Sequence, residues 1–288
     1  MFDNPPSLPY NDERTTFWEV IMMHPETIQR MKLFLFDMDG TLYLGDELFG
    51  FTIPLLRRIR ETGGRYLFMT NNSSKSVEDY IRKLKKLGIH ADREDFITSA
   101  QATAWYLLQN HPGKPLYVCG TASFKEELTR AGLEVTGDAD RAQCIVMGFD
   151  TELTFQKLWD VSRLLLTRDI PYIATNPDYV CPTEFGSVPD CGSVCDMIFN
   201  ATKKRPLVIG KPEALMPQLA MARLGMDAAH TCCIGDRIYT DIRCGLNAGI
   251  TTILVLSGEA TLQTLAESDI KPHFVLKDAG EILDALST

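Results

Sequence analysis

The clearest pattern in the chain is a run of four apolar residues, 33–36, that ends in charged side chains. A continuous apolar run of this length predicts a strand buried on both faces of a parallel sheet. Asp37 and Asp39 follow directly, and Gly40 permits a sharp turn with positive φ. Ligands of α/β proteins bind at the carboxyl ends of such strands, and two close carboxylates there repel unless a cation lies between them. Taken alone, the segment is equally compatible with an acidic surface turn.

Strand patterns and helix patterns alternate along the rest of the chain. A second apolar strand, at 66–69, ends in polar residues at 70–73, and a helix follows with Ser76 as its cap and Asp79 three residues on. The other expected helices lie at 52–61, 100–109, 124–131, 155–166, 194–201, 212–224 and 240–248, with strands at 116–119, 144–147, 172–174, 207–209, 231–234, 251–256 and 274–276. This alternation predicts an α/β fold with a doubly wound, Rossmann-like parallel sheet that carries helices on both faces.

Three other segments divide the chain. Residues from about 99 form an α/β block of their own, in which the stretch 176–192, rich in Pro, Gly and Cys, predicts a loop. The basic stretch 203–206 predicts an exposed linker, after which the strand and helix units resume. Residues before about 31 carry little pattern, and their role is not evident from the sequence.

A basic run, Arg82-Lys83-Lys85-Lys86, lies within the helix that follows Ser76. Its positions fall mostly opposite the apolar stripe of that helix. We therefore interpret the run as a solvent-exposed helix face rather than a binding patch.

Composition limits the possible functions. The 288 residues are 45% apolar and 23% charged, as in ordinary globular proteins, and the net charge of -9 disfavours general nucleic-acid binding. No apolar run approaches the length of roughly 20 residues that spans a bilayer, and the first residues lack the pattern of a secretory signal. The eight cysteines are scattered through apolar segments. We therefore expect reduced thiols and a cytoplasmic protein without membrane or nucleic-acid partners.

Four expected strand ends carry polar residues suited to one task. They are Asp37 with Asp39, Thr70 with Asn71, Lys211, and Asp236 with Asp241 five residues on. Because the carboxyl ends of parallel strands share one edge of the sheet, we expect these groups to converge there. The acids need a cation, and oxygen ligands without His or Cys favour Mg²⁺ over zinc. A hydroxyl, an amide and an ammonium beside them suit a phosphate group.

These motifs resemble those of the haloacid dehalogenase (HAD) superfamily. The segments DMDGT at 37–41 and TN at 70–71, Lys211, and GD at 235–236 with Asp241 match its four motifs in order. Finer features are similar to the NagD and p-nitrophenyl phosphatase branch (class IIA): TNNS at 70–73, ATNPD at 174–178, GKP at 210–212 and LVLSG at 254–258. The resemblance covers the chain from about residue 32 to the end. It implies a core formed by 32–98 and 205–288, an inserted α/β cap at 99–204, and an N-terminal extension at 1–31.

The resemblance also implies a mechanism and assigns roles to the matched residues. Asp37 would attack phosphorus and form an aspartyl phosphate, and Asp39 would act as general acid and then general base. Thr70, the backbone N–H of Asn71 and Lys211 would bind the phosphoryl group. Mg²⁺ would be held by the side chains of Asp37 and Asp236 and by the backbone carbonyl of Asp39, with Asp241 orienting bound water or Lys211.

In this branch, a cap loop faces the core site and helps to select the substrate. The positions of this chain that could make such contacts are Asn176, Asp178, Tyr179, Glu184 and Phe185. Each of them could equally serve only to shape the loop.

We therefore expect a Mg²⁺-dependent phosphatase of small phosphomonoesters such as sugar phosphates, phosphoglycolate, nucleoside monophosphates or pyridoxal phosphate. Two alternatives remain. One is a phosphotransferase that passes the same phosphoryl group to an alcohol, and the other is a ligand-sensing protein that keeps the fold without turnover. The expected partner is a small phosphorylated metabolite, and a homo-oligomer is possible.

Overall fold

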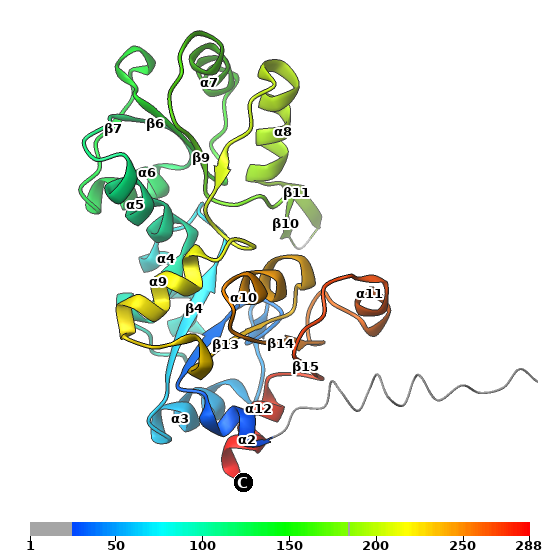
Figure 1. Cartoon of the computed structure of the whole chain (residues 1–288). Helices are drawn as coiled ribbons and strands as arrows, with labels where there is room; N and C mark the ends of the chain where they lie inside the picture. Colours follow the sequence, from blue (N-terminus) through cyan, green and yellow to red (C-terminus); the bar gives the residue numbers. More distant parts are fainter. Residues whose placement is uncertain (1–24, 184) are drawn as a thin grey trace, which may run out of the picture.

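The computed structural model describes residues 25–183 and 185–288. In that part of the chain, two parallel sheets lie one above the other (Figure 1). The lower one, here called the core sheet, has six strands in the order β15-β14-β13-β1-β4-β5. The upper one, the cap sheet, has five strands in the order β12-β9-β8-β6-β7. All strand pairs within the two sheets are parallel, which confirms the predicted α/β class.

The boundaries of the elements follow the predicted alternation closely. The core strands are β1 (Leu33–Phe36), β4 (Arg65–Thr70), β5 (Phe96–Thr98), β13 (Thr231–Gly235), β14 (Thr251–Val255) and β15 (Phe274–Leu276). Around them lie α2 (Pro25–Arg30), α3 (Thr52–Glu61), α4 (Val77–Lys86), α5 (Ser99–Asn110), α9 (Leu215–Leu224), the π-helical η4 (Ile238–Ile242), α10 (Arg243–Asn247), α11 (Leu262–Glu267) and α12 (Gly280–Ser287).

The cap contains the strands β6 (Leu116–Cys119), β7 (Val135–Thr136), β8 (Cys144–Met147), β9 (Tyr172–Ala174) and β12 (Leu207–Val208), and the helices α6 (Ala122–Arg130), α7 (Phe155–Thr167) and α8 (Cys191–Thr202). Two antiparallel hairpins complete the chain: β2 (Tyr43–Leu44) with β3 (Glu47–Leu48), and β10 (Val180–Thr183) with β11 (Gly186–Pro189). The β10–β11 hairpin extends from the cap toward the core (Figure 1). Within the described ranges, none of the helices combines the length and the apolarity that crossing a bilayer requires.

Strand β1 is central to the core sheet and explains where a site can form. On one side it pairs with β4, the next core strand along the chain, and on the other with β13 from the C-terminal part. The strand order therefore reverses beside β1, and such switch points open a crevice at the carboxyl ends of the strands.

The apolar run in β1 is buried on both faces, as the sequence predicts. Phe34 and Phe36 pack in one apolar cluster with α2, α3, α4 and α12, whereas Leu33 and Leu35 pack in a second cluster with α5 and α9. Successive side chains of a strand point to opposite faces, so a strand covered on both sides needs no polar position. The second cluster continues through α5 into the cap, where it includes Phe124.

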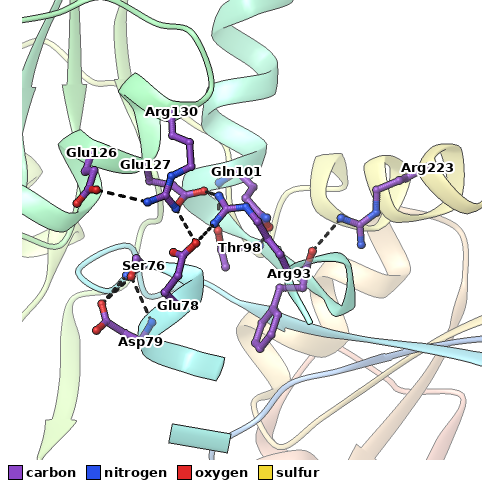
Figure 2. Close-up of polar contacts among 11 residues, drawn as sticks. Ser76, Glu78, Asp79, Arg93, Thr98, Gln101, Glu126, Glu127, Arg130 and Arg223 are labelled. Carbon is purple, nitrogen blue, oxygen red and sulfur yellow. Dashed lines mark hydrogen bonds and ion pairs between the residues drawn. The ribbon is translucent and has the colours of Figure 1, made fainter. Parts of the chain in front are cut away.

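Charged side chains join the cap to the core on the side of α4. Glu78 of α4 accepts hydrogen bonds from Arg93 (2.7 Å) and from Arg130 of the cap helix α6 (2.6 Å). Arg93 also pairs with Glu127 of α6, which is almost fully buried. Figure 2 shows the two guanidinium groups directed at these carboxylates. The start of α4 is fixed as predicted, because the Ser76 hydroxyl accepts from the Asp79 N–H and the Asp79 carboxylate from the Ser76 N–H.

The structure corrects two sequence-based expectations. The strand before Lys211 was expected in the core sheet, but β12 pairs with β9 in the cap sheet. Because β12 has only two residues, its sequence carries no pattern that distinguishes the core sheet from the cap sheet. The segment 176–192, expected as a loop, contains the β10–β11 hairpin, whose Pro and Gly residues hide any strand pattern.

The packing of α2 and the pairing of β12 suggest domain boundaries that differ from the expected ones. Ile28 of α2 is fully buried, and Gln29 donates a hydrogen bond to the Ala285 carbonyl (3.0 Å), so α2 packs on the core. We therefore propose that the core begins by residue 25 rather than at 32, and that the chain returns to it after Val208 rather than at 205. Residues 1–24 of the expected N-terminal extension lie outside the described residues.

Candidate active site

Three of the predicted groups lie at the carboxyl ends of adjacent strands. Asp37 follows β1, Thr70 ends β4 and Asp236 follows β13. Because β1 pairs in parallel with both neighbours, these residues share one edge of the core sheet. The predicted convergence is therefore present at the switch point.

Lys211 reaches the same edge from outside the core sheet. Its ammonium donates hydrogen bonds to Asp37 Oδ1 and to Asp241 Oδ1, both at 2.6 Å, and lies 3.3 Å from the Met69 carbonyl. Burial alone would lower the pKa of Lys211, but the carboxylates of Asp241 and Asp37 outweigh it and hold the pKa well above the usual value. Lys211 is thus a fixed positive charge beside the expected nucleophile.

The Asn71 side chain holds the Lys211 backbone in place. Asn71 Oδ1 accepts from the Lys211 N–H (2.7 Å), and Asn71 Nδ2 donates to the Lys211 carbonyl (2.8 Å). A Cβ atom on Gly210 would lie 2.4 Å from the Thr175 carbonyl oxygen, so only glycine allows this close approach. The sequence suggested a backbone contact of Asn71 with phosphate, but not this structural use of its side chain.

Three carboxylates gather at the edge of the sheet. Oxygen atoms of Asp37, Asp236 and Asp241 lie within 4.8 Å of one another. Burial, reinforced by Asp37 and Asp241, raises the pKa of Asp236 to about 7, and burial raises the pKa of Asp241 to about 6 although Lys211 opposes the rise. Three acids this close are costly without a positive charge between them.

One of these acids has an oxygen that the protein does not satisfy. Asp236 Oδ2 accepts from the Glu259 N–H (2.8 Å), whereas Oδ1 is buried without a hydrogen-bond partner among the described residues. A buried carboxylate oxygen without a donor is expected to have a ligand. The donor set consists of oxygens only, which fits a hard divalent cation such as Mg²⁺.

The turn after Asp39 brings the backbone close to Asp236. Gly40 has φ +81°, which confirms the positive φ expected at this glycine. A Cβ at this position would lie 2.4 Å from Asp236 Oδ2, so a larger residue would not fit.

The Asp39 side chain lies outside the cluster of three acids. Its Oδ1 accepts from the Gly45 N–H (3.4 Å), and its Oδ2 lies 3.8 Å from the ammonium of Lys83. The Asp39 carboxylate is therefore separate from the acid cluster and is held by two long contacts.

A cavity of about 880 Å³ lies over these residues, between core and cap. Thr70, Asn71 and Lys211 line its floor, and the cap contributes Asp178 and Phe185. Asp178 Oδ2 accepts from Asn71 Nδ2 (2.9 Å), which links the cap to the turn after β4, and its Oδ1 is buried without a partner in the described chain.

The structure places two of the five expected cap contacts away from the cavity lining. Asn176 is fully buried and donates to the carboxylates of Asp178 (3.0 Å) and Asp190 (3.2 Å), so it shapes the loop instead of lining the cavity. Tyr179 is exposed and does not line the cavity. Glu184 lies outside the described residues.

Sequence reasoning missed several residues that line the cavity. One of them is Arg237, next to Asp236, which forms an ion pair with Glu259 (3.0 Å). Burial alone would lower the pKa of Arg237, but the carboxylates of Asp37 and Glu259 outweigh burial and raise that pKa. Its place directly after the GD motif is a signal that could have been noticed. Lys75 and Lys83 also line the cavity, and the Lys83 side chain is 27% exposed, so Lys83 is less open to solvent than the interpretation of the basic run as a solvent-exposed face implies.

Comparisons with known proteins show which family this chain resembles. Residues 34–134 match a family model described as haloacid dehalogenase-like hydrolase, and residues 208–282 match one described as HAD-hydrolase-like. The acid sugar phosphatase of Staphylococcus aureus is 33% identical over 259 residues, which cover 90% of this chain and 99% of that protein.

Solved structures are similar over the same extent. The 4-nitrophenylphosphatase of Thermotoga maritima has a TM-score of 0.87 and 36% identity, covering 90% of this chain and 99% of that one. The glycerol phosphate phosphatase of Mycobacterium tuberculosis in complex with magnesium has a TM-score of 0.82 and 30% identity, covering 90% of this chain and 77% of that one.

Proposed function

We infer that this chain, which belongs to the haloacid dehalogenase-like hydrolases, is a phosphatase of small phosphomonoesters that uses Mg²⁺ and an aspartyl phosphate. The observation that carries the proposal is the contact between Lys211 and Asp37 at the edge that also holds Asp236 and Asp241. The relatives named above, phosphatases of sugar phosphate, nitrophenyl phosphate and glycerol phosphate, support the same reaction type.

In the first step, a carboxylate oxygen of Asp37 attacks phosphorus, and the bond from phosphorus to the ester oxygen breaks. Asp39 gives its proton to the leaving alcohol, which its position away from the acid cluster allows. In the second step, Asp39 takes a proton from water, whose oxygen attacks the phosphorus of the aspartyl phosphate. Phosphate leaves, and both aspartates return to their starting states.

The remaining residues stabilise charge. Lys211 donates a hydrogen bond to Asp37 and lies where it can offset the charge that develops on the phosphoryl group. Thr70 and the Asn71 N–H would bind phosphoryl oxygens at the floor of the cavity. Mg²⁺, held by Asp37, Asp236 and the Asp39 carbonyl, would neutralise the negative charge that substrate and carboxylates share.

The cavity supports a small substrate. A volume of about 880 Å³ is in the range of small-molecule sites, and the cap hairpin contributes to its lining. A phosphorylated protein side chain would have to enter beneath that hairpin.

The test is phosphate release from p-nitrophenyl phosphate and a panel of phosphorylated metabolites, with Mg²⁺ or EDTA. We expect Mg²⁺-dependent turnover, and a loss of at least about a thousandfold in Asp37→Asn because the nucleophile is removed. The matched control is Asp284→Asn, the same chemical change at an exposed aspartate of α12 that does not line the cavity, and it should behave as the wild type.

Two outcomes would favour the alternatives instead. A phosphoester product that exceeds free phosphate when an alcohol is added would indicate a phosphotransferase. Absence of turnover with every substrate would indicate a ligand-sensing protein.

A further inference from the structure

A second hollow adjoins the catalytic cavity beside α4. It has a volume of about 630 Å³ and shares Asp46, Lys75 and Lys83 with the larger cavity as lining residues. Arg82 and Lys86 contribute to the rest of its wall. The catalytic cavity therefore extends toward the helix face that carries the basic run.

This hollow is positively charged in a chain whose net charge is -9. Four cationic side chains line it, against the two carboxylates of Asp46 and Asp79. Asp79 is already engaged, because it caps α4 and pairs with Arg82. Within residues 25–183 and 185–288, no carboxylate lies within ion-pair distance of Lys75 or Lys86.

Lys83 joins the two cavities. Its ammonium lies 4.2 Å from the centre of the Tyr43 ring and 3.8 Å from Asp39 Oδ2. Its side chain is only 27% exposed, so the aliphatic part is packed rather than free in solvent. An ammonium carries three donors, and the single long contact with Asp39 leaves donors for a ligand in the cavity.

The part of the cavity lining that the cap contributes is acidic. The cap contributes Asp178 and Asp190, and Arg237 of the core is paired with Glu259. A substrate that carries a second negative charge would be repelled on the cap side. The wall formed by α4 is where such a charge would be attracted.

We propose that Lys83 and Lys75 form a subsite for a second anionic group of the substrate, a carboxylate or a second phosphate, bound a few atoms from the transferred phosphoryl group. The proposal rests on the proposed phosphatase function and narrows its substrate class to phosphomonoesters with an additional anion. Lys86 lies farther along the same hollow, within reach of a longer substrate.

Matched substrates test this directly. Glycerol 3-phosphate and 3-phosphoglycerate differ by one carboxylate in place of a hydroxymethyl group, and fructose 6-phosphate and fructose 1,6-bisphosphate differ by one phosphate. We expect the wild-type kcat/KM to be higher for the anionic member of at least one pair, and the pair that responds identifies the anion. In Lys83→Met that preference should fall by about tenfold or more, because a charged hydrogen bond is lost. Lys75→Met should reduce it less.

Three further variants make the test specific. Lys83→Arg keeps the charge and should retain most of the preference. Lys85→Met removes an exposed lysine of α4 that lines neither cavity, and should leave the preference unchanged. Asp46→Asn removes the competing carboxylate and should increase the preference for the anionic substrate.

The results separate this proposal from other roles of Lys83. If Lys83→Met slows both members of a pair by the same factor, Lys83 acts through Asp39 or through the fold, and the subsite does not exist. Turnover of p-nitrophenyl phosphate without any preference for anionic substrates would overturn the subsite and leave the phosphatase function intact. Absence of turnover with all substrates would overturn both.

Discussion

The ammonium of Lys211 lies 2.6 Å from the carboxylate of Asp37, although 174 positions separate the two residues in the chain. A second carboxylate, that of Asp241, lies at the same distance from it. One buried cation thus stabilises two acids that would otherwise repel each other and the phosphate they are expected to meet. Asn71 holds the backbone of Lys211 through two hydrogen bonds, so the turn after β4 and this buried cation are fixed relative to each other.

Removal of Lys211 should reduce both stability and activity. Lys211→Met leaves the carboxylates of Asp37 and Asp241 without their counter-charge, and breaking a buried ion pair costs about 3–5 kcal/mol. We expect a loss of unfolding free energy of that order in urea at pH 7.5 without Mg²⁺, and a fall in kcat of at least about a hundredfold. Lys85→Met, which changes an exposed lysine, is the control. Unchanged stability of Lys211→Met would mean that the ion pairs are not formed in solution.

Binding of Mg²⁺ should strengthen as the pH rises through about 7. Without metal, burial and neighbouring acids raise the pKa of Asp236 to about 7, so the native protein holds a proton there that an unfolded chain would release. Metal-free protein should therefore lose stability as the pH rises from about 5 to 7.5. Below pH 7 a cation must displace that proton, so the affinity should fall by about tenfold per pH unit.

Calorimetric titration with Mg²⁺ between pH 5.5 and 8 measures this, and Asp236→Asn is the matched variant. In that variant most of the affinity and the pH dependence near 7 should be lost together, and only the dependence near 6 that Asp241 sets should remain. A wild-type affinity that is independent of pH would contradict the raised pKa of Asp236, and an unchanged affinity in Asp236→Asn would show that Asp236 is not a ligand.

The hydrogen bond between Asn71 and Asp178 should couple the cap to the turn that we propose binds phosphate. Asp178→Ala removes the acceptor and leaves Asn71 Nδ2 with the Lys211 carbonyl alone. We expect a higher KM and a lower kcat for small substrates, which together lower kcat/KM by about ten- to a hundredfold, the effect of losing one hydrogen bond to a charged group. Steady-state kinetics with p-nitrophenyl phosphate test this. Tyr179→Phe, at an exposed neighbour outside the cavity, should behave as the wild type. Equal effects of the two variants would contradict the coupling.

Two neighbouring glutamates of α6, Glu126 and Glu127, allow an exposed charge to be compared with a buried one (Figure 2). Glu127 is almost fully buried and faces Arg93 and Arg130, whereas the Glu126 side chain is 72% exposed. Glu127→Gln should reduce the free energy of unfolding by about 1–3 kcal/mol, because the partly exposed guanidinium groups lose a charged acceptor. Glu126→Gln should change it by less than about 0.5 kcal/mol. Equal values from urea denaturation would show that the network does not hold the cap.

The sequence predicted those site residues that lie at the carboxyl ends of buried core strands. Asp37, Thr70 and Asp236 each end a strand whose apolar pattern is unmistakable, and parallel pairing then brings them together. Lys211 was expected at the same edge for a partly wrong reason, because it follows a strand of the cap sheet and reaches the site through the turn at Gly210.

Residues on cavity walls were predicted less well. The apolar stripe of α4 separates positions that face the core from those that do not, but it cannot show that one of the latter, Lys83, lines a cavity. For the same reason Asn176 and Tyr179 could not be distinguished from Asp178, because loop sequences do not encode which side chains turn inward. That distinction depends on tertiary contacts.

The most direct test of the account is to trap the proposed intermediate on Asp37. Acid-quenched enzyme is taken during turnover of p-nitrophenyl phosphate, reduced with borohydride, which converts an aspartyl phosphate into homoserine, and analysed by peptide mass spectrometry. The account predicts homoserine at position 37, dependent on substrate, and none in the Asp37→Asn variant. Full turnover with an unmodified Asp37, or modification at another aspartate, would contradict it.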